Sequence, residues 1–433
     1  MEPCALDTSY RDDGWYLMER LFPIHRTLVN RGYLQSLQII NETLPLTIKE
    51  YPSGDEVWDW IIPNAWDVKE AWIKDENGNK VIDFANNNLH LAAYSIPFSG
   101  VLSREELLPH ISYLEELPDA IPFEYLYYGK NDWRFCMSKN QLEMLKGSHF
   151  EVKIEVDYYP SYLRIGECLL PGETDTEILV TAYLCHPSMA NDSLSGVVVG
   201  TEVFRFLSRL KHRHYTYRFI IIPETIGAIT FLAKHEEILP RIRGGFVVTC
   251  CGDPGPLRYK KSYFGDAFVD RAAVHALAHE MNGADFVVED FSPAGSDERQ
   301  FNAPGVRIPF GSLMRSRYEI YPEYHTSLDN LSLVRPEYLF ETMHALVKML
   351  YVIDNNTIFK NKFRGEPFLS KHGLHIPFKN DKGAGFLNQI IIHETDGTKD
   401  VLQIAEKHAC SFYSLLEISL AFEKAGLIER KPS

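Results

Sequence analysis

Residues 178–196 read ILVTAYLCHPSMANDSLSG, and this stretch indicates the fold class of the chain. Its first seven residues are mostly apolar strand formers, the pattern of a β-strand that is buried on both faces. Pro187 ends that strand, and a polar turn then leads into an apolar run at 197–207 that has helical character. A buried strand followed by a helix in this way is typical of an open α/β sheet.

Two polar side chains lie at the carboxyl end of this predicted strand. His186 follows the strand directly, and Asp192 lies in the turn before the helix. Open α/β sheets bind their ligands in the crevice at this edge, and an imidazole with a carboxylate is half of a plausible zinc site. A histidine bonded to backbone and an aspartate that caps the helix explain the two residues equally well, because two ligands do not make a site.

The composition is that of an ordinary globular protein, with 45% hydrophobic and 24% charged residues in a chain of 433. That length predicts about three domains of ~150 residues. The net charge of −15 argues against a general binder of nucleic acid or of anionic membranes. We find no signal peptide and no apolar run near the ~20 residues of a membrane span. Seven scattered cysteines favour reduced thiols and a cytoplasmic location.

Alternating strand and helix patterns predict an α/β domain over residues 1–47 and 143–357, with a mostly parallel sheet and helices on both faces. Between these two segments the residue pattern changes. Residues 48–142 hold short β-type runs that are rich in aromatics and separated by Pro, Asn and Gly, which predicts an inserted β-rich domain. Its four tryptophans are more typical of a domain core than of a ligand groove.

Residues 358–433 predict a winged helix-turn-helix, with helices at 399–407 and 412–424 followed by Gly426. This segment carries 11 Lys and Arg against 9 Asp and Glu, and the second helix is not basic. A helix that reads nucleic acid normally carries Arg, Lys, Asn or Gln. We therefore expect contacts within the chain or in a homo-oligomer rather than nucleic-acid binding.

Two more residues follow predicted strands of the same sheet. Glu224 comes after the buried strand 218–222, and His325 follows the last strand through a polar loop. Each alone is explained by a surface or capping role, but their joint placement with His186 and Asp192 favours a site. Two imidazoles and a carboxylate are typical ligands of a catalytic zinc, and an unligated glutamate beside them is a candidate general base.

Four blocks occur in one order along the chain: HPSMANDSLSG, PETIGAITFL, GSDERQF and YHTSLD. Together they resemble the zinc aminopeptidases that use a co-catalytic metal pair, over about residues 150–350. The whole chain is similar to one branch of that family, bacterial aminopeptidase-like proteins with an inserted small domain and a C-terminal winged helix. Some members of that branch are described as polysaccharide-biosynthesis proteins.

The resemblance implies a role for each candidate residue. His186 corresponds to the first metal histidine, Asp192 to the aspartate that bridges the two metals, and His325 to the last metal histidine. Glu224 corresponds to the catalytic base.

Three positions depart from the family pattern. Thr225 stands where a second glutamate is usual, Ser188 stands where an aspartate is usual, and Cys250 replaces another aspartate unless Asp253 reaches back. One zinc on His186, Asp192 and His325 is therefore easier to defend than two, and Cys250 is more readily an inert buried thiol than a ligand.

Three functions fit these observations. The first is a zinc-dependent aminopeptidase-like amide hydrolase, which acts on a peptide or an aminoacyl or amide small molecule. The second is a catalytically inactive binding protein that keeps the aminopeptidase fold, with a link to polysaccharide biosynthesis left open, since fold does not fix function. The third, a winged-helix regulator, has the least support from the charges of the C-terminal segment.

Overall fold

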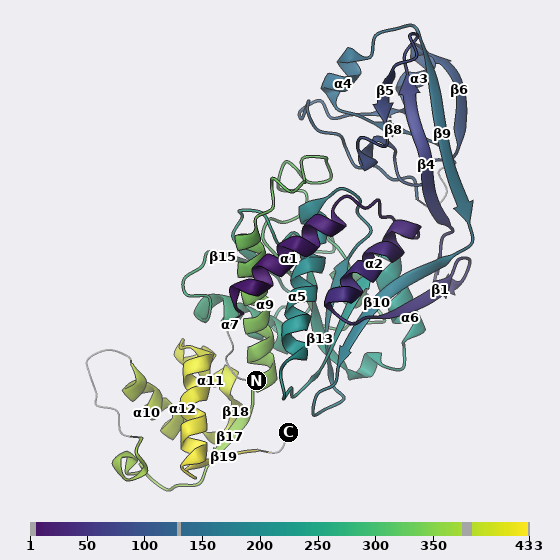
Figure 1. The fold of residues 1–433 in the computed structure, drawn as a ribbon. Coiled ribbons are helices and arrows are strands. Elements are labelled where there is room, and N and C mark those ends of the chain that lie inside the picture. The colour runs from purple at the N-terminus through teal and green to yellow at the C-terminus, as the bar shows by residue number, and fades with distance from the viewer. Residues whose placement is uncertain (1–5, 128–130, 375–382, 432–433) are drawn as a thin grey trace.

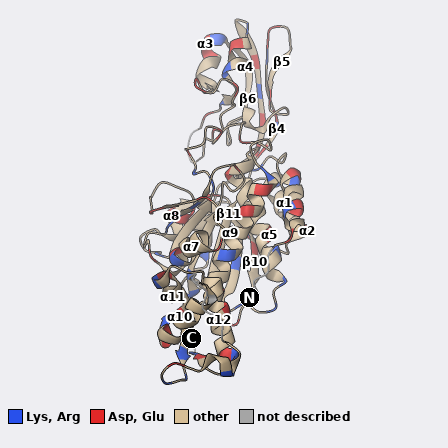
Figure 2. Ribbon diagram, turned by 90° about the vertical axis from the view of Figure 1, so that its left-hand side faces the viewer, with Lys and Arg blue, Asp and Glu red and all other residues tan. Residues whose placement is uncertain are grey.

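The structure is a computed structural model that describes residues 6–127, 131–374 and 383–431. The chain forms an elongated molecule in which a large α/β part lies between two smaller parts (Figure 1). A β-rich part lies at one end and a C-terminal part with the helices α10 (Ala384–Glu394), α11 (Val401–His408) and α12 (Phe412–Lys424) at the other, as the side view also shows (Figure 2). No helix among these described residues is both long and apolar enough to cross a membrane.

The large part is built on an eight-stranded sheet. Its strands lie in the order β1 (Thr47–Pro52), β10 (Tyr162–Leu170), β12 (Thr216–Ile222), β11 (Glu177–Tyr183), β13 (Ile242–Val248), β16 (Phe310–Met314), β14 (Leu257–Lys260) and β15 (Phe286–Glu289). The four central strands, β12, β11, β13 and β16, run parallel. The sheet is nevertheless mixed, because β1 pairs antiparallel with β10, β10 with β12 and β14 with β16, whereas the other four pairings are parallel.

Helices cover this sheet in layers. They are α1 (Thr8–Leu21), α2 (Arg31–Thr43), α5 (Gly196–Ser208), α6 (Ile226–Lys234), α7 (Phe268–His279), α8 (Glu298–Phe301) and α9 (Pro336–Asn355). The α5 helix contacts the central strands, α9 packs on α5 and α7, and α1 packs on α9 and α5. In Figure 1, α1, α5 and α9 lie in front of the sheet. The centre of the sheet is shielded from solvent, since every residue of β11 and β12 is buried.

The two N-terminal helices pack on the large part. The second helix, α2, begins at Arg31. The Asn30 side chain caps it by accepting a hydrogen bond from the backbone N–H of Tyr33 at 2.8 Å. Residues 24–30 therefore form an irregular link that reaches into the protein.

The β-rich part holds a four-stranded antiparallel sheet, in the order β5 (Lys80–Asp83), β4 (Ala65–Lys74), β9 (His149–Tyr159) and β6 (Phe98–Ser103). A small ladder joins β7 (Ile111–Ser112) to β8 (Phe135–Cys136), and α3 (Arg104–Leu107) and α4 (Lys139–Met144) complete it. The hairpin of β2 (Glu56–Val57) and β3 (Trp60–Ile61) packs instead against α6 of the large part. The sequence placed β1 with the β-rich part and β9 with the α/β part. The pairings reverse both, since an alternating pattern predicts a half-buried strand but not the sheet it joins. The division into three domains otherwise stays a prediction.

The C-terminal part is a three-stranded antiparallel sheet with three helices. The strands lie in the order β18 (Asp396–Asp400), β17 (Ile358–Asn361) and β19 (Ile428–Arg430), beside α10 (Ala384–Glu394), α11 (Val401–His408) and α12 (Phe412–Lys424). Glu280, next to the end of α7, accepts hydrogen bonds from the Phe412 backbone N–H at 2.8 Å and the Ser411 hydroxyl at 3.0 Å. These bonds fix α12 to the large part. The winged helix stays a prediction.

Candidate metal centre

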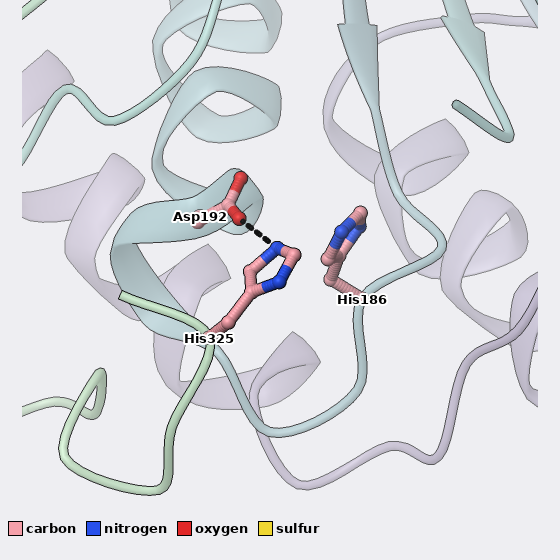
Figure 3. A group of neighbouring side chains, drawn as sticks. All are labelled: His186, Asp192 and His325. Carbon is pink, nitrogen blue, oxygen red and sulfur yellow. Dashed lines mark ion pairs between the residues drawn. The ribbon is translucent and has the colours of Figure 1, made fainter. Parts of the chain in front are cut away.

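Three of the four predicted site residues meet beyond the carboxyl ends of the central strands. His186 lies in the loop after β11, Asp192 lies in the short helical turn Ala190–Ser195 that leads into α5, and His325 lies in the loop after β16. Figure 3 shows the three side chains pointing toward one another. One ligand atom from each lies within 4.8 Å of the others. Around one zinc ion such atoms are about 3.3 Å apart, so a modest closure suffices to bind it.

The His325 imidazole is paired with the carboxylate of the cluster. Its Nε2 atom lies 3.0 Å from Asp192 Oδ2 in an ion pair, although the contact is poorly aligned for a hydrogen bond. His186 and Asp192 are only 6% and 1% exposed. Two imidazoles and a carboxylate that meet in such a largely buried position have the chemistry of a zinc site.

The protonation states of two of the three suit a metal. Burial lowers the pKa of His186 to about 4, which leaves a neutral imidazole with a free lone pair. Burial alone raises the pKa of Asp192, but His186, His325 and the Tyr183 hydroxyl outweigh it and lower that pKa to about 2. Burial lowers the pKa of His325, whereas the Asp192 carboxylate raises it more, for a net rise. A cation that binds here therefore has to displace a proton from His325 alone.

The fourth residue, Glu224, follows β12 at the rim of the cluster. Its Oε2 atom lies 3.7 Å from His186 Nε2, and its side chain is 25% exposed. The Ser296 hydroxyl donates to Glu224 Oε1 at 2.9 Å. Burial, followed by the charge of Asp192, raises the pKa of Glu224 to about 7. A carboxyl group with this pKa can take up and release a proton near neutral pH.

The positions that depart from the family pattern do not add a ligand. Cys250 is fully buried, and burial followed by the nearby Asp192 charge raises the pKa of its thiol well above the usual value. Asp253 does not reach back, because its oxygens accept from the Asn191 amide at 3.1 Å and the Ser316 backbone N–H at 3.1 Å. Thr225 has no carboxylate, and its φ of +63° is unusual for a β-branched residue.

Two positioning residues were not predicted from the sequence. Asp329 is fully buried and accepts hydrogen bonds from the backbone N–H groups of Ala190 at 3.0 Å and Asp192 at 2.9 Å, so it holds the turn in place. Its position four residues after His325, inside a block already singled out, is the signal that could have found it. The Tyr183 hydroxyl, at the end of β11, donates to Asp192 Oδ1 at 2.6 Å.

Arg26 was also not predicted, and no local pattern points to it. This arginine is 1% exposed and reaches from the link between α1 and α2 to the loop after β11. It donates to the backbone oxygens of Leu184 at 3.2 Å and His186 at 2.9 Å. The N-terminal segment thereby supports the loop that carries the His186 side chain.

The β-rich part contacts the same centre. The Phe123 backbone N–H donates to the His325 backbone oxygen at 2.8 Å, and the Ser327 N–H donates to the Ile121 oxygen at 2.8 Å. The Phe123 ring centre lies 5.2 Å from that of His186 and 5.3 Å from that of His325. On the other side, the Tyr324 ring stacks on His325 at 3.9 Å. The two imidazoles thus sit among aromatic rings, one of which comes from the β-rich part.

The fold is aminopeptidase-like. It is similar to that of BSAP, a zinc aminopeptidase from Bacillus subtilis, with a TM-score of 0.59 and 16% identity over 79% of this chain and 94% of that one. The aminopeptidase from Aneurinibacillus sp. strain AM-1 matches with a TM-score of 0.52 and 15% identity over 79% of this chain and 93% of that one.

The family is shown by longer matches. Residues 15–356 match the family described as "Domain of unknown function (DUF4910)", and the chain belongs to that family. A Clostridium acetobutylicum protein, provisionally named a polysaccharide biosynthesis protein with aminopeptidase-like domain, is 40% identical over 422 residues, 95% of each chain. A crystal structure of a provisionally assigned peptidase from the same organism has a TM-score of 0.92 at 37% identity, over 98% of this chain and 97% of that one.

Proposed function

We propose that the protein is a metal-dependent amide hydrolase of the aminopeptidase type, with one zinc ion held by His186, Asp192 and His325. The observation that carries the proposal is that one ligand atom from each of these residues lies within 4.8 Å of the others in a largely buried position. The zinc aminopeptidases with the same fold support the choice of metal. A zinc ion supplies Lewis acidity, which polarises an amide carbonyl and lowers the pKa of water to ~7.

Glu224 is the general base in this proposal. Its Oε2 atom faces the centre, its pKa of about 7 lets it accept a proton from the attacking water, and it then returns the proton to the leaving amine. The Ser296 hydroxyl bonds the other oxygen and so keeps Oε2 directed inward. Phe123 and Tyr324 flank the imidazoles and exclude water from their outer faces.

The substrate we propose is a peptide or an aminoacyl or amide small molecule. The named activities of the structural neighbours support a peptide. None of the six described cysteines forms a disulfide, which supports a reducing compartment such as the cytoplasm. A role in polysaccharide biosynthesis rests only on the provisional name of the Clostridium relative.

A second candidate is an inactive binding protein with the same fold. It is favoured by Thr225 and by the protonated, buried thiol of Cys250, since neither can replace the carboxylates that a second metal ion would need. Both candidates predict a ligand in the same place, so only activity separates them.

The test compares the wild type with Glu224→Gln and with Glu237→Gln, a control at an exposed glutamate whose side chain is 69% accessible. We expect zinc to copurify in a chelator-free preparation, and Glu224→Gln to lower hydrolysis of aminoacyl amides by about 10²–10⁴-fold with zinc content and melting temperature unchanged. Unchanged turnover in Glu224→Gln removes it as the base. A zinc-loaded wild type that cleaves no substrate of a broad panel establishes the binding protein instead.

A further inference from the structure

A cavity lies at the amino ends of the central strands, at the opposite end of these strands from the candidate metal centre. It has a volume of about 960 Å³ and is lined by residues at the amino ends of β12 and β13, such as Tyr215 and Arg243, and by Ile358 and Asp400 of the C-terminal part. This volume is near the upper end of the ~300–1,000 Å³ that is usual for small-molecule sites. The cavity therefore lies between two parts of the molecule and is large enough to hold a metabolite.

Five cations line this cavity, and one of them, Arg430, pairs with Glu423. The other four, Arg209, Lys211, Arg243 and Lys431, form no ion pair anywhere in the described ranges 6–127, 131–374 and 383–431. The Lys431 ammonium group donates to the Gly397 backbone oxygen at 2.6 Å. Arg209 donates to a tyrosine hydroxyl at 3.0 Å. The Arg243 guanidinium donates to the Tyr215 hydroxyl and lies 4.0 Å over the Phe268 ring. These contacts hold the two guanidinium groups in place without an ion pair to a carboxylate.

The three carboxylates that line the cavity are already engaged. Asp354 accepts from the His214 backbone N–H at 2.9 Å and from the Tyr217 hydroxyl at 2.9 Å. Asp400 caps α11 by accepting from a backbone N–H at 2.7 Å, and Glu173 lies 3.7 Å from the His214 ring. Five Lys and Arg side chains face these three carboxylates, so the lining keeps a surplus of positive charge in a chain whose net charge is −15.

Neutral hydrogen-bonding groups face the same space. Asn356 uses its side-chain oxygen to accept from the Leu402 backbone N–H at 2.9 Å, which leaves its amide N–H groups to donate. The Thr357 hydroxyl has no hydrogen-bond partner among the described residues. Leu210 and Leu420 supply a small apolar surface. A ligand with one strongly anionic end and a hydroxyl-bearing body matches this lining.

We infer that the cavity binds a phosphate ester of a small polyhydroxylated molecule, of the sugar-phosphate class. The phosphate lies among Arg209, Lys211 and Arg243, because guanidinium groups pair with phosphate oxygens in a bidentate geometry and an ammonium group adds a point charge. The hydroxyl groups lie toward Asn356 and Thr357. Such a ligand contacts both the large part and the C-terminal part, and its binding site is independent of the candidate metal centre.

The test is calorimetric titration of the full-length chain with inorganic phosphate, glucose 1-phosphate, glucose and a nucleoside diphosphate. We expect glucose 1-phosphate to bind more tightly than inorganic phosphate and glucose not to bind. Lys211→Gln and Arg243→Gln each weaken binding of the ester by about tenfold or more, as the loss of a hydrogen bond to a charged group does. Arg241→Gln, which removes the same charge outside the cavity, leaves binding unchanged.

Several results overturn the inference. They are the absence of binding by every phosphate probe at millimolar concentration, unchanged affinity in both cavity variants, and equal weakening in Arg241→Gln, which indicates diffuse attraction. Tighter binding of the nucleoside diphosphate than of glucose 1-phosphate refutes the sugar-phosphate class. Lys211→Gln remains decisive if Arg243→Gln fails to fold, because Lys211 makes no hydrogen bond or ion pair with the described residues.

Discussion

Replacement of Arg26 by methionine tests whether the N-terminal link shapes the candidate metal centre. The buried guanidinium donates to four backbone oxygens, those of Leu21, Ile24, Leu184 and His186. Methionine fills a similar volume but donates nothing, so all four oxygens lose a partner. Two of them belong to the loop that carries the His186 imidazole. We expect this loop to loosen.

The magnitude follows from two opposing contributions. Burial lowers the pKa of Arg26 from 12.5 to about 10, which corresponds to about 3.4 kcal/mol of unfavourable burial of the charge. Hydrogen bonds to a charged group contribute about 1.5–3 kcal/mol each, so four of them contribute about 6–12 kcal/mol. The methionine variant no longer bears the cost of burying the charge, but it loses the stabilisation from the four hydrogen bonds. We expect it to be less stable by about 3 kcal/mol or more.

Urea unfolding and zinc titration measure the two consequences. Alongside the stability loss, we expect about a 10–100-fold loss of zinc affinity, which is usual when a group that orients a metal ligand is removed. Arg20→Met is the matched control, because Arg20 is 30% exposed in an ion pair with Glu42 and such a pair contributes about 0–1 kcal/mol. If Arg26→Met unfolds within about 1 kcal/mol of that control and binds zinc as the wild type does, the reasoning is refuted.

Three further predictions concern other parts of the chain. In Gly196→Ala the new Cβ falls 1.9 Å from the Val248 backbone oxygen, so we expect a loss of about 1–3 kcal/mol or more in urea unfolding, whereas Gly100→Ala, whose nearest neighbour is at 3.4 Å, is tolerated. Burial raises the pKa of Glu394, but three basic side chains outweigh it and lower the pKa from 4.5 to about 2; its stabilisation is complete above pH ~4.5 and disappears as the pH falls toward ~2. Hydrogen exchange of the C-terminal part should therefore show Glu394→Gln less stable than the wild type by ~1–3 kcal/mol at pH 7 and equal to it near pH 2. A stability difference between the two proteins that is the same at both pH values contradicts this. Asp329→Asn turns an amide toward backbone N–H donors, and we expect at least tenfold weaker zinc binding in the same titration, with wild-type affinity as the contrary result.

The buried strands of the large sheet could be predicted because each one is an apolar run with a sharp end. The run at 178–184 corresponds to β11 and the run at 218–222 to β12, each within two residues. Sheet order and strand direction could not be predicted in the same way. They depend on pairing between distant segments, as the move of β9 (His149–Tyr159) to the small sheet shows. A strand with one solvent-exposed face shows the same alternation of apolar and polar residues whichever sheet it joins.

The candidate ligands could be predicted because topology alone brings strand ends together. His186 and Glu224 follow adjacent parallel strands, so their proximity needs no knowledge of loop conformation. Arg26 and Phe123 reach the centre by contacts that span 160 and 202 positions in the chain. Neither lies in a motif, and an arginine or phenylalanine in those stretches is otherwise an ordinary surface or core residue.

The geometry of His325 is set by segments from several parts of the chain. Its φ of +53° is uncommon for a residue other than glycine, and such a conformation costs on the order of 1–3 kcal/mol. It persists because Phe123 of the β-rich part binds its carbonyl, Tyr324 stacks on its ring, and Asp329 anchors the following residues to the turn that carries Asp192. The β-rich part is therefore not a passive addition to the large sheet. It holds one of the two imidazoles in the orientation that places its Nε2 atom 3.0 Å from Asp192 Oδ2.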